Sequence, residues 1–321
     1  MKTIYRRAIS AATLLLCCLN SACAQEEKAA EKSAQGAGTG FFFANDSEGF
    51  TTRRLTLEYL PKYRHAQWLS GLRYTKHHFA QDAWSRNGQQ LSFLQRQIDP
   101  VTTSGWQWEA GIFHQGRHDL LSLAASYRAI LGEHTSVELF LNRDWVETAA
   151  ALDNGVHFNF GGLALDQQLS PRLSLTGLAG LQRFSDGNVR KHGRIRLSFQ
   201  PDPDLGLTLQ ARFRVTISSH DQVAGAYFNP GRYQETMLAV GWRNKLDGWL
   251  SNVTAGIGRQ KVATDAASAT NLLEWSLESP IKTHGNSAYS FRARAGRSQS
   301  AAFGGPDYRY NYVQGEWILA F

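Results

Sequence analysis

The sequence predicts an all-β fold, a single antiparallel transmembrane β-barrel of about sixteen strands in the bacterial outer membrane. Three observations support this prediction. Apolar and polar residues alternate in one segment after another from Phe41 onwards, which is typical of strands with two different faces. The chain begins with a secretory leader, and its last segment alternates up to the terminal residue, Phe321. We therefore expect an exported protein that crosses the membrane with strands.

Residues 1–24 have the three parts of a signal peptide: a positive start, a short apolar run and an A-x-A cleavage site. These parts are Lys2, Arg6 and Arg7, then residues 11–19, then Ala22-Cys23-Ala24. We favour cleavage before Gln25 over lipidation of Cys23, because the residues before this cysteine form a poor lipobox. All three cysteines of the chain lie in the leader, so the mature chain would hold neither a disulfide nor a thiolate metal site.

The remaining chain divides into a short spacer and one domain. Residues 25–38 are polar, charged and small, which predicts a flexible periplasmic spacer. Residues 39–321 have a uniform composition without a linker or a charge block, which predicts one outer-membrane β-barrel. No run of about 18 apolar residues follows the leader, so the sequence offers no candidate transmembrane helix.

The alternation separates a membrane barrel from a soluble sandwich, which also alternates. Over residues 205–217, one face is apolar while the other carries Arg212 and Arg214, and arginine or glutamate recurs on the polar face of other segments. The segments are also longer than the ~5–6 residues usual for soluble strands. The apolar face carries tryptophans that we expect at the lipid interfaces. They are Trp68, Trp106, Trp108, Trp242, Trp249, Trp275 and Trp317.

The pattern predicts strands near 39–46, 51–60, 65–77, 89–97, 105–115, 119–129, 135–146, 155–167, 172–184, 189–199, 205–218, 232–243, 249–261, 270–279, 287–298 and 308–321. Short periplasmic turns are expected at Pro61, Gly132-Glu133, Ser170-Pro171, residues 201–204 and Asp247-Gly248. Longer external connections are expected near 78–88, 146–154, 218–231 and 299–307. An even strand number places both termini in the periplasm. The terminal phenylalanine of the last strand resembles the C-terminal signal of outer-membrane barrels.

No motif for catalysis rises above chance. The chain has no G-x-S-x-G, H-E-x-x-H, Walker or G-x-G-x-x-G sequence, and His157 with Asn159 lacks a matched serine. The histidines show no metal-binding spacing. The net charge is +7, but the basic residues are scattered singly, which argues against a nucleic-acid partner. We therefore predict no catalytic residue, metal or cofactor.

Charged and aromatic residues on the inward face are the candidate site. They are Arg194, Arg196, Arg212, Arg214, Arg243, Arg292, Arg294, Glu274, Glu316, Tyr310 and Tyr312. Further inward acids, among them Glu58, Glu109 and Glu235, are expected to face these arginines. Two compatible interpretations remain open: an ion-pair lattice that stiffens the barrel, and a polar path on which arginine binds sugar hydroxyls or acidic groups. The tyrosines could stack on sugar rings or fill space.

One connection carries a family resemblance. The string Tyr227-Phe228-Asn229-Pro230 is followed by Tyr233, an alternating strand and Ala255-Gly256-Ile257-Gly258. It resembles the C-terminal barrel of exopolysaccharide exporters, the cellulose synthase outer-membrane subunit and the poly-N-acetylglucosamine export porin. The resemblance implies sixteen strands and outward passage of a polysaccharide chain. Those proteins usually carry a periplasmic tetratricopeptide region, which the spacer here is too short to hold, so a scaffold and an inner-membrane synthase would be separate proteins.

Three classes of function follow from these observations. The first is an outer-membrane channel for exopolysaccharide export. The second is a barrel with a plugged lumen that serves as a surface binding or adsorption protein, or else a general porin. The third and least favoured is a barrel enzyme acting on lipid or glycan, which would need a serine or paired carboxylates at one rim.

Overall fold

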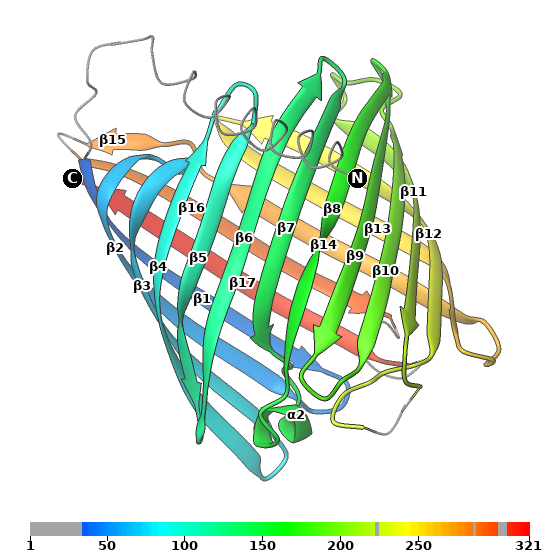
Figure 1. Ribbon diagram of the computed structural model, residues 1–321. Coiled ribbons are helices and arrows are strands. Elements are labelled where there is room, and N and C mark those ends of the chain that lie inside the picture. The colour runs from blue at the N-terminus through cyan, green and yellow to red at the C-terminus, as the bar shows by residue number, and fades with distance from the viewer. Residues whose placement is uncertain (1–33, 222–224, 285–286, 301–306) are drawn as a thin grey trace, which may run out of the picture. The chain divides into compact units, whose positions relative to one another are not determined.

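A computed structural model describes residues 34–221, 225–284, 287–300 and 307–321. The described chain is one closed antiparallel sheet in which each strand pairs with the next, and the last strand pairs with the first (Figure 1). The closing register runs from Gly36 opposite Ala320 to Asp46 opposite Tyr310. A closed sheet leaves no strand edge unpaired, as a membrane interior requires. The predicted sixteen-stranded barrel is therefore confirmed.

Sixteen strands form the barrel wall, and the three-residue β15 (Lys282–His284) is a short addition that pairs with β16. The wall strands are β1 (Ala34–Asp46), β2 (Thr51–His65), β3 (Trp68–Gln81), β4 (Trp84–Ile98), β5 (Gly105–Gln115), β6 (His118–Gly132), β7 (Thr135–Trp145), β8 (His157–Ser170), β9 (Leu173–Phe184), β10 (Val189–Phe199), β11 (Leu207–Ser218), β12 (Arg232–Leu246), β13 (Trp249–Val262), β14 (Ser268–Glu278), β16 (Ser287–Gln299) and β17 (Arg309–Ala320). One helix is described, α2 (Ala149–Asp153). No helix in these residues is long and apolar enough to cross a membrane.

The outward faces of the strands form an apolar band. Leu55 is 64% exposed and Ile257 is 74% exposed, and many other large apolar side chains share this exposure. Such a surface would be unfavourable in water but suits a lipid environment. We call the end that holds Ala34 and Phe321 the periplasmic end, following the prediction for the termini, and the other end the extracellular mouth.

The first strand begins earlier than predicted. β1 starts at Ala34, so residues 34–38 of the predicted spacer belong to the sheet. These small residues are weak strand formers, but they pair on one side with β2 and on the other with β17, and tertiary pairing outweighs intrinsic preference. The predicted leader and the rest of the spacer, residues 1–33, lie outside the described residues.

Pro61 does not form the predicted turn. It lies inside β2, where the pairing with β3 shifts register between Tyr59 and Lys62. A bulge tolerates proline, because a residue there has no ladder hydrogen bond to lose. Across the bulge, a Cβ on Gly71 would lie 2.1 Å from the carbonyl oxygen of Tyr59. The bulge therefore brings two backbones so close that only glycine fits.

The predicted long connection at 78–88 is also wrong. β3 and β4 continue as a hairpin to Gln81 and Trp84, with Asp82 in the left-handed region at φ 50°. A tight turn of this kind favours such a backbone conformation. The polarity of the segment reflects a hairpin tip at the mouth and not a loop.

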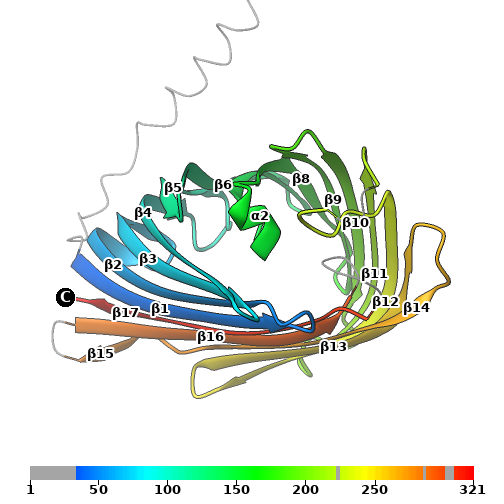
Figure 2. The same cartoon turned by 90° about the horizontal axis from the view of Figure 1, so that it is seen from below.

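The connection between β7 and β8 folds inward. Figure 2 shows α2 inside the ring of strands. Thr148 caps the N-terminal end of α2, and its hydroxyl accepts a hydrogen bond from the Ala151 amide at 3.2 Å. Leu152 is fully buried in an apolar cluster at the mouth, formed with Phe50, Phe79, Phe113, Leu120 and Trp145. This helix is therefore a packed constriction.

Candidate functional site

The lumen is lined by two groups of charged residues on opposite sides of the ring of strands. We call the first group the ion-paired wall: Arg73, Arg292, Glu58, Glu109, Glu278 and Glu316, on strands around β2, β3 and β17. We call the second group the arginine wall: Arg194, Arg196, Arg212 and Arg214, on β10 and β11. In the strand order, β10 and β11 lie across the barrel from β1 and β2.

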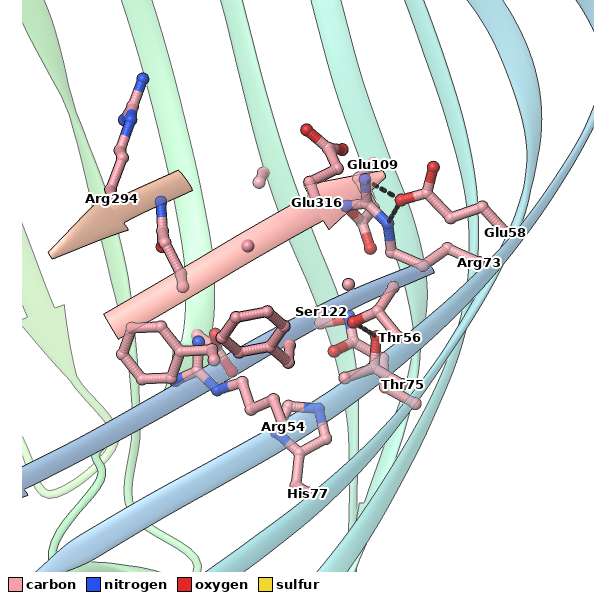
Figure 3. A pocket seen from close by; sticks show the side chains of 18 of the residues that line it. Arg54, Thr56, Glu58, Arg73, Thr75, His77, Glu109, Ser122, Arg294 and Glu316 are labelled. Carbon is pink, nitrogen blue, oxygen red and sulfur yellow. Dashed lines mark hydrogen bonds and ion pairs between the residues drawn. The ribbon is translucent and has the colours of Figure 1, made fainter. Parts of the chain in front are cut away.

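In the ion-paired wall, each arginine lies between two carboxylates. Arg73 Nη2 lies 2.6 Å from Glu58 Oε1, and its other terminal nitrogen pairs with Glu109 (Figure 3). Arg292 lies 3.3 Å from Glu278 and 3.6 Å from Glu316. All of them except Glu278 border a cavity of about 400 Å³. The predicted ion-pair lattice is present here, although Arg73, its central residue, was not among the candidates.

In the arginine wall, like charges face each other across two strands. Arg194 is directly opposite Arg214, and Arg196 is directly opposite Arg212. Arg214 Nη2 donates to both carboxylate oxygens of Glu235, at 2.8 and 2.9 Å. The wall borders a second cavity, of about 510 Å³, which also receives Glu274, Tyr310 and Tyr312 from other strands. The structure thus brings together seven of the predicted candidates around one space.

Glu235 is the acceptor at the centre of a buried network. The hydroxyl of Tyr233 donates to Glu235 Oε2 at 2.7 Å, and the Ser300 hydroxyl donates to the same oxygen at 2.9 Å. Thr270 adds a longer bond of 3.3 Å. Tyr233 is only 1% exposed, so this member of the loop motif is a core residue at the base of the loop rather than a ligand-contacting one.

The rest of the loop motif folds onto the mouth. The Tyr227 ring stacks on Phe184 with centroids 4.5 Å apart, and its hydroxyl donates to Asp186 at 2.9 Å. Asn188 in turn donates to the Tyr227 hydroxyl at 3.1 Å. Burial, with the adjacent Asp186 carboxylate, raises the pKa of Tyr227 above its ordinary value. The phenol therefore remains a proton donor at physiological pH.

Arg190 ties the same loop to the barrel wall. Its Nη2 donates to the Phe228 carbonyl and to Asn229 Oδ1, both at 2.9 Å. Asn229 donates from its amide nitrogen to the His220 carbonyl at 2.7 Å, and Pro230 is buried beside it. The Tyr-Phe-Asn-Pro segment is thus held against the barrel wall, and we call it the lip. Residues 222–224 of the predicted connection lie outside the described residues.

A third cavity, of about 520 Å³, lies between this lip and the α2 connection. Its lining includes Asp46, Asp144, Glu147, Arg190 and Tyr227. Arg54, below the mouth, pairs with Glu147. The hydroxyl of Thr148 at the start of α2 donates to the Ala226 carbonyl, which links the lip to the helix. The mouth is therefore narrowed by two connections that hold each other.

Two predicted candidates do not join these groups. Arg243 is exposed, lies near the periplasmic end of β12 and borders none of the three cavities. Arg294 borders the first cavity but stands away from the paired cluster (Figure 3) and has no ion pair within the described residues. Conversely, Arg54, Arg73 and Arg190 were missed. Strand parity marks Arg54 and Arg73 as inward, but no sequence signal places a loop beside Arg190.

The His157 and Asn159 side chains, considered above for catalysis, both have structural partners. Asn159 accepts a hydrogen bond from Arg143 at 2.8 Å, and His157 packs edge-on against Trp145 with ring centroids 5.9 Å apart. Within the described residues, no group of three or more His, Cys, Asp or Glu side chains could hold a metal ion. The described charged groups line cavities in the barrel interior.

The fold defines a sixteen-stranded barrel of the bacterial outer-membrane class. The structure is similar to a bacterial polysaccharide outer membrane secretin, with a TM-score of 0.67 and 14% identity over 90% of this chain and 99% of that one. Two weaker matches have TM-scores below 0.5. OccD1 (OprD) has a TM-score of 0.46 and 12% identity, over 91% of this chain and 96% of that one. OccAB3 of Acinetobacter baumannii has a TM-score of 0.43 and 9% identity, over 90% of this chain and 100% of that one. No family model matches the sequence. No curated protein matches it either.

Proposed function

We propose that this protein is an outer-membrane channel that exports an exopolysaccharide. The observation that carries the proposal is the composition of the lumen: three cavities of about 400, 510 and 520 Å³, all bordered by charged and aromatic side chains. A barrel that served only as a scaffold would gain stability from a packed apolar interior, whereas a hydrated solute needs polar groups along its path.

The fold likeness supports the same proposal, because the similar barrel is described as a polysaccharide secretin. The aromatic residues suit a sugar polymer: Phe42 and Tyr312 stack with centroids 6.3 Å apart, and Tyr310 lies 6.1 Å from Tyr312. Aromatic faces offer apolar contact while neighbouring charged groups bind hydroxyls. The proposal contains no enzymatic step, and it assigns polymer synthesis and any periplasmic scaffold to separate proteins.

In this proposal the lip and α2 form the exit gate. Both narrow the extracellular mouth, and the Thr148–Ala226 and Arg190–Asn229 hydrogen bonds hold them in place. A neutral hydrogen bond contributes about 1 kcal/mol and a bond from a charged group about 1.5–3 kcal/mol, so a polymer pressing from the periplasmic side can displace a few of them.

Planar-bilayer recording of the purified protein tests the channel, and polymer secretion by cells tests the cargo. Deleting residues 221–231 should raise single-channel conductance several-fold. Loss of the gene should abolish surface polysaccharide while leaving its intracellular synthesis intact, and re-expression should restore it. Zero conductance of both the intact and the loop-deleted protein would contradict an open channel.

A second candidate is a surface adsorption barrel with a closed lumen. The apolar cluster around Leu152 favours it, because six buried side chains pack at the mouth. The same recording separates the two candidates, since a closed barrel stays silent after the lip is deleted. It would also leave polysaccharide secretion unchanged when the gene is lost.

A further inference from the structure

The arginine wall combines four positive charges with little compensation. On one face of an antiparallel pair, directly opposite residues have Cβ atoms ~4.5–5.5 Å apart, and like charges at such positions are destabilising. Two such pairs follow each other, Arg194 with Arg214 and Arg196 with Arg212. A fold that only needed stability would alternate the charges, as the ion-paired wall does.

The partners of these arginines are mostly neutral. Within the described residues, Arg214 has the one ion pair of the wall, with Glu235, and Glu235 is already shared with the Tyr233 and Ser300 hydroxyls. Arg196 donates to the Thr176 hydroxyl at 3.2 Å, and Arg212 donates to the Gln210 side-chain oxygen at 2.8 Å. Arg194 has no hydrogen bond or ion pair with any described residue. Three guanidinium groups thus keep donors available.

These guanidinium groups border the 510 Å³ cavity. The 510 Å³ cavity has five arginines and two glutamates among its lining residues. Arg194 and Arg196 are exposed to it. One of the two acids, Glu235, is committed to the buried network, which leaves Glu274 as the remaining counter-charge. The cavity therefore carries an excess of positive charge in a confined space, where water screens charge less well.

The positive charge also extends along the passage. Arg190, Arg194 and Arg196 lie on the same face of β10, as their even spacing requires. At a rise of about 3.3 Å per residue, they span about 20 Å along the tilted strand. Tyr310 and Tyr312 border the same cavity from β17. A column of guanidinium groups with facing aromatic rings suits a chain of sugar rings that carry acidic groups.

We propose that the arginine wall binds the anionic groups of the transported polymer, so that the cargo is an acidic polysaccharide bearing carboxylate, phosphate or sulfate groups. This inference rests on the proposed function for the passage of a polymer. Arginine binds such groups through two parallel N–H bonds. Directly opposite arginines place two guanidinium groups side by side. An acidic chain that passes them relieves the repulsion between their positive charges.

The direct test measures binding, which does not depend on an open channel. Fluorescently labelled oligogalacturonate is titrated into the detergent-solubilised full-length protein, with labelled neutral dextran of matched length as the comparison. We expect oligogalacturonate to bind at least 10-fold more tightly than dextran, with an affinity that falls as salt rises. The triple variant Arg194→Gln, Arg196→Gln, Arg212→Gln should lose this difference.

Two further variants keep the test decisive. Arg53→Gln removes an exposed arginine on the outer face of β2, where Leu55 also lies, so its oligogalacturonate affinity should stay within about 2-fold of wild type. Arg196→Gln alone should weaken binding about 3-fold, which keeps the inference testable if the triple variant fails to fold. Equal binding of acidic and neutral chains would overturn the inference, as would a loss of affinity in Arg53→Gln as large as in the triple variant.

Two further experiments test competition by a small anion and conduction through the channel. Sodium sulfate should compete with oligogalacturonate only at much higher concentration, and equal competition would overturn the assignment to a polymer. Bilayer recordings then separate the two proposals. A conducting protein without acidic preference refutes the arginine-wall inference alone, whereas a silent protein that still binds oligogalacturonate refutes the channel alone.

Discussion

In the ion-paired wall Arg73 lies between Glu58 and Glu109, whereas in the arginine wall Arg194 and Arg196 face two other arginines. Both walls belong to one barrel and both point into its lumen. Their environments differ in burial: the Glu58 side chain is 5% exposed, while Arg194 and Arg196 are exposed to the second cavity. A buried carboxylate requires a permanent partner, but a hydrated guanidinium does not.

The difference separates two uses of the same residue type. Charges that are paired inside the protein stiffen the wall and leave little binding capacity for a solute. Charges that remain unpaired contribute nothing to stability, and their repulsion costs a small amount, so their presence calls for a ligand. Stability measurements on single variants can therefore sort lumen arginines into structural and functional ones.

The largest effect is expected from Arg73→Gln. The substitution leaves two carboxylates without their cation, one of them almost fully buried. Breaking such a pair costs about 3 kcal/mol, measured as the free energy of unfolding in urea with the barrel in lipid vesicles. Combining Arg73→Met with Glu58→Leu should recover part of the loss. A loss below about 1 kcal/mol in Arg73→Gln would show that the ion-paired wall is not structural.

Glu235→Gln should have the next largest effect, because among the described residues this carboxylate is the acid that forms an ion pair with the arginine wall. The glutamine side chain carries no charge, so it cannot form the ion pair with Arg214. It also has one acceptor oxygen instead of two for the hydrogen bonds from Arg214, Tyr233 and Ser300. We expect unfolding to become easier by about 2 kcal/mol. Glu274→Gln is the matched control, since Glu274 has no ion pair within the described residues, and it should change stability by less than half as much. An equal loss of stability in the two variants would show that the Glu235 network does not stabilise the barrel more than an unpaired lumen carboxylate does.

Tyr227→Phe addresses the lip, where the tyrosine hydroxyl bonds to Asp186 and Asn188. Its loss should weaken lip closure by about 1 kcal/mol, seen as amide hydrogen exchange about five times faster at the described residues of the lip. Tyr127→Phe is the control, because Tyr127 is exposed on the outer face. Unchanged exchange at the lip would contradict its anchoring by Tyr227.

The pH dependence of the same lip follows from the raised pKa of Tyr227, caused first by burial and then by Asp186. Folding favours the protonated phenol, so its contribution is complete below the ordinary tyrosine pKa of about 10. It is lost only as pH rises through the higher value of the closed lip. Lip protection measured by exchange should therefore persist at pH 10, and a loss already at pH 9 would falsify this expectation.

The smallest effect is expected from Arg196→Gln. Arg196 faces Arg212, and its one hydrogen-bond partner among the described residues is the Thr176 hydroxyl. Removing its charge relieves a repulsion and loses a weak bond, so stability should change by no more than about 0.5 kcal/mol. If unfolding becomes easier by as much as in Arg73→Gln, the two walls are alike and the contrast between them fails.

Much of the barrel was predictable because its signals are local. Alternation over residues 205–217 assigns inward and outward faces from one strand alone. From residue 105 onwards the predicted wall strands match the observed ones within three residues. The errors arise where pairing overrides local composition. Pro61 looks like a turn but occupies a bulge opposite Gly71, and the small residues 34–38 form a strand because β2 and β17 flank them.

The sequence by itself determined the fold class, the number of strands and the residues that face the lumen, since these depend on a period of two along the chain. Only the tertiary structure decided which arginine meets which acid. Arg73 is paired because the register of β2 with β3 and the curvature of the wall bring Glu58 and Glu109 to it. Arg194 has no ion pair among the described residues, because the register of β10 with β11 places Arg214 opposite it. The inward fold of the lip onto Arg190 likewise depends on contacts between residues far apart in the chain.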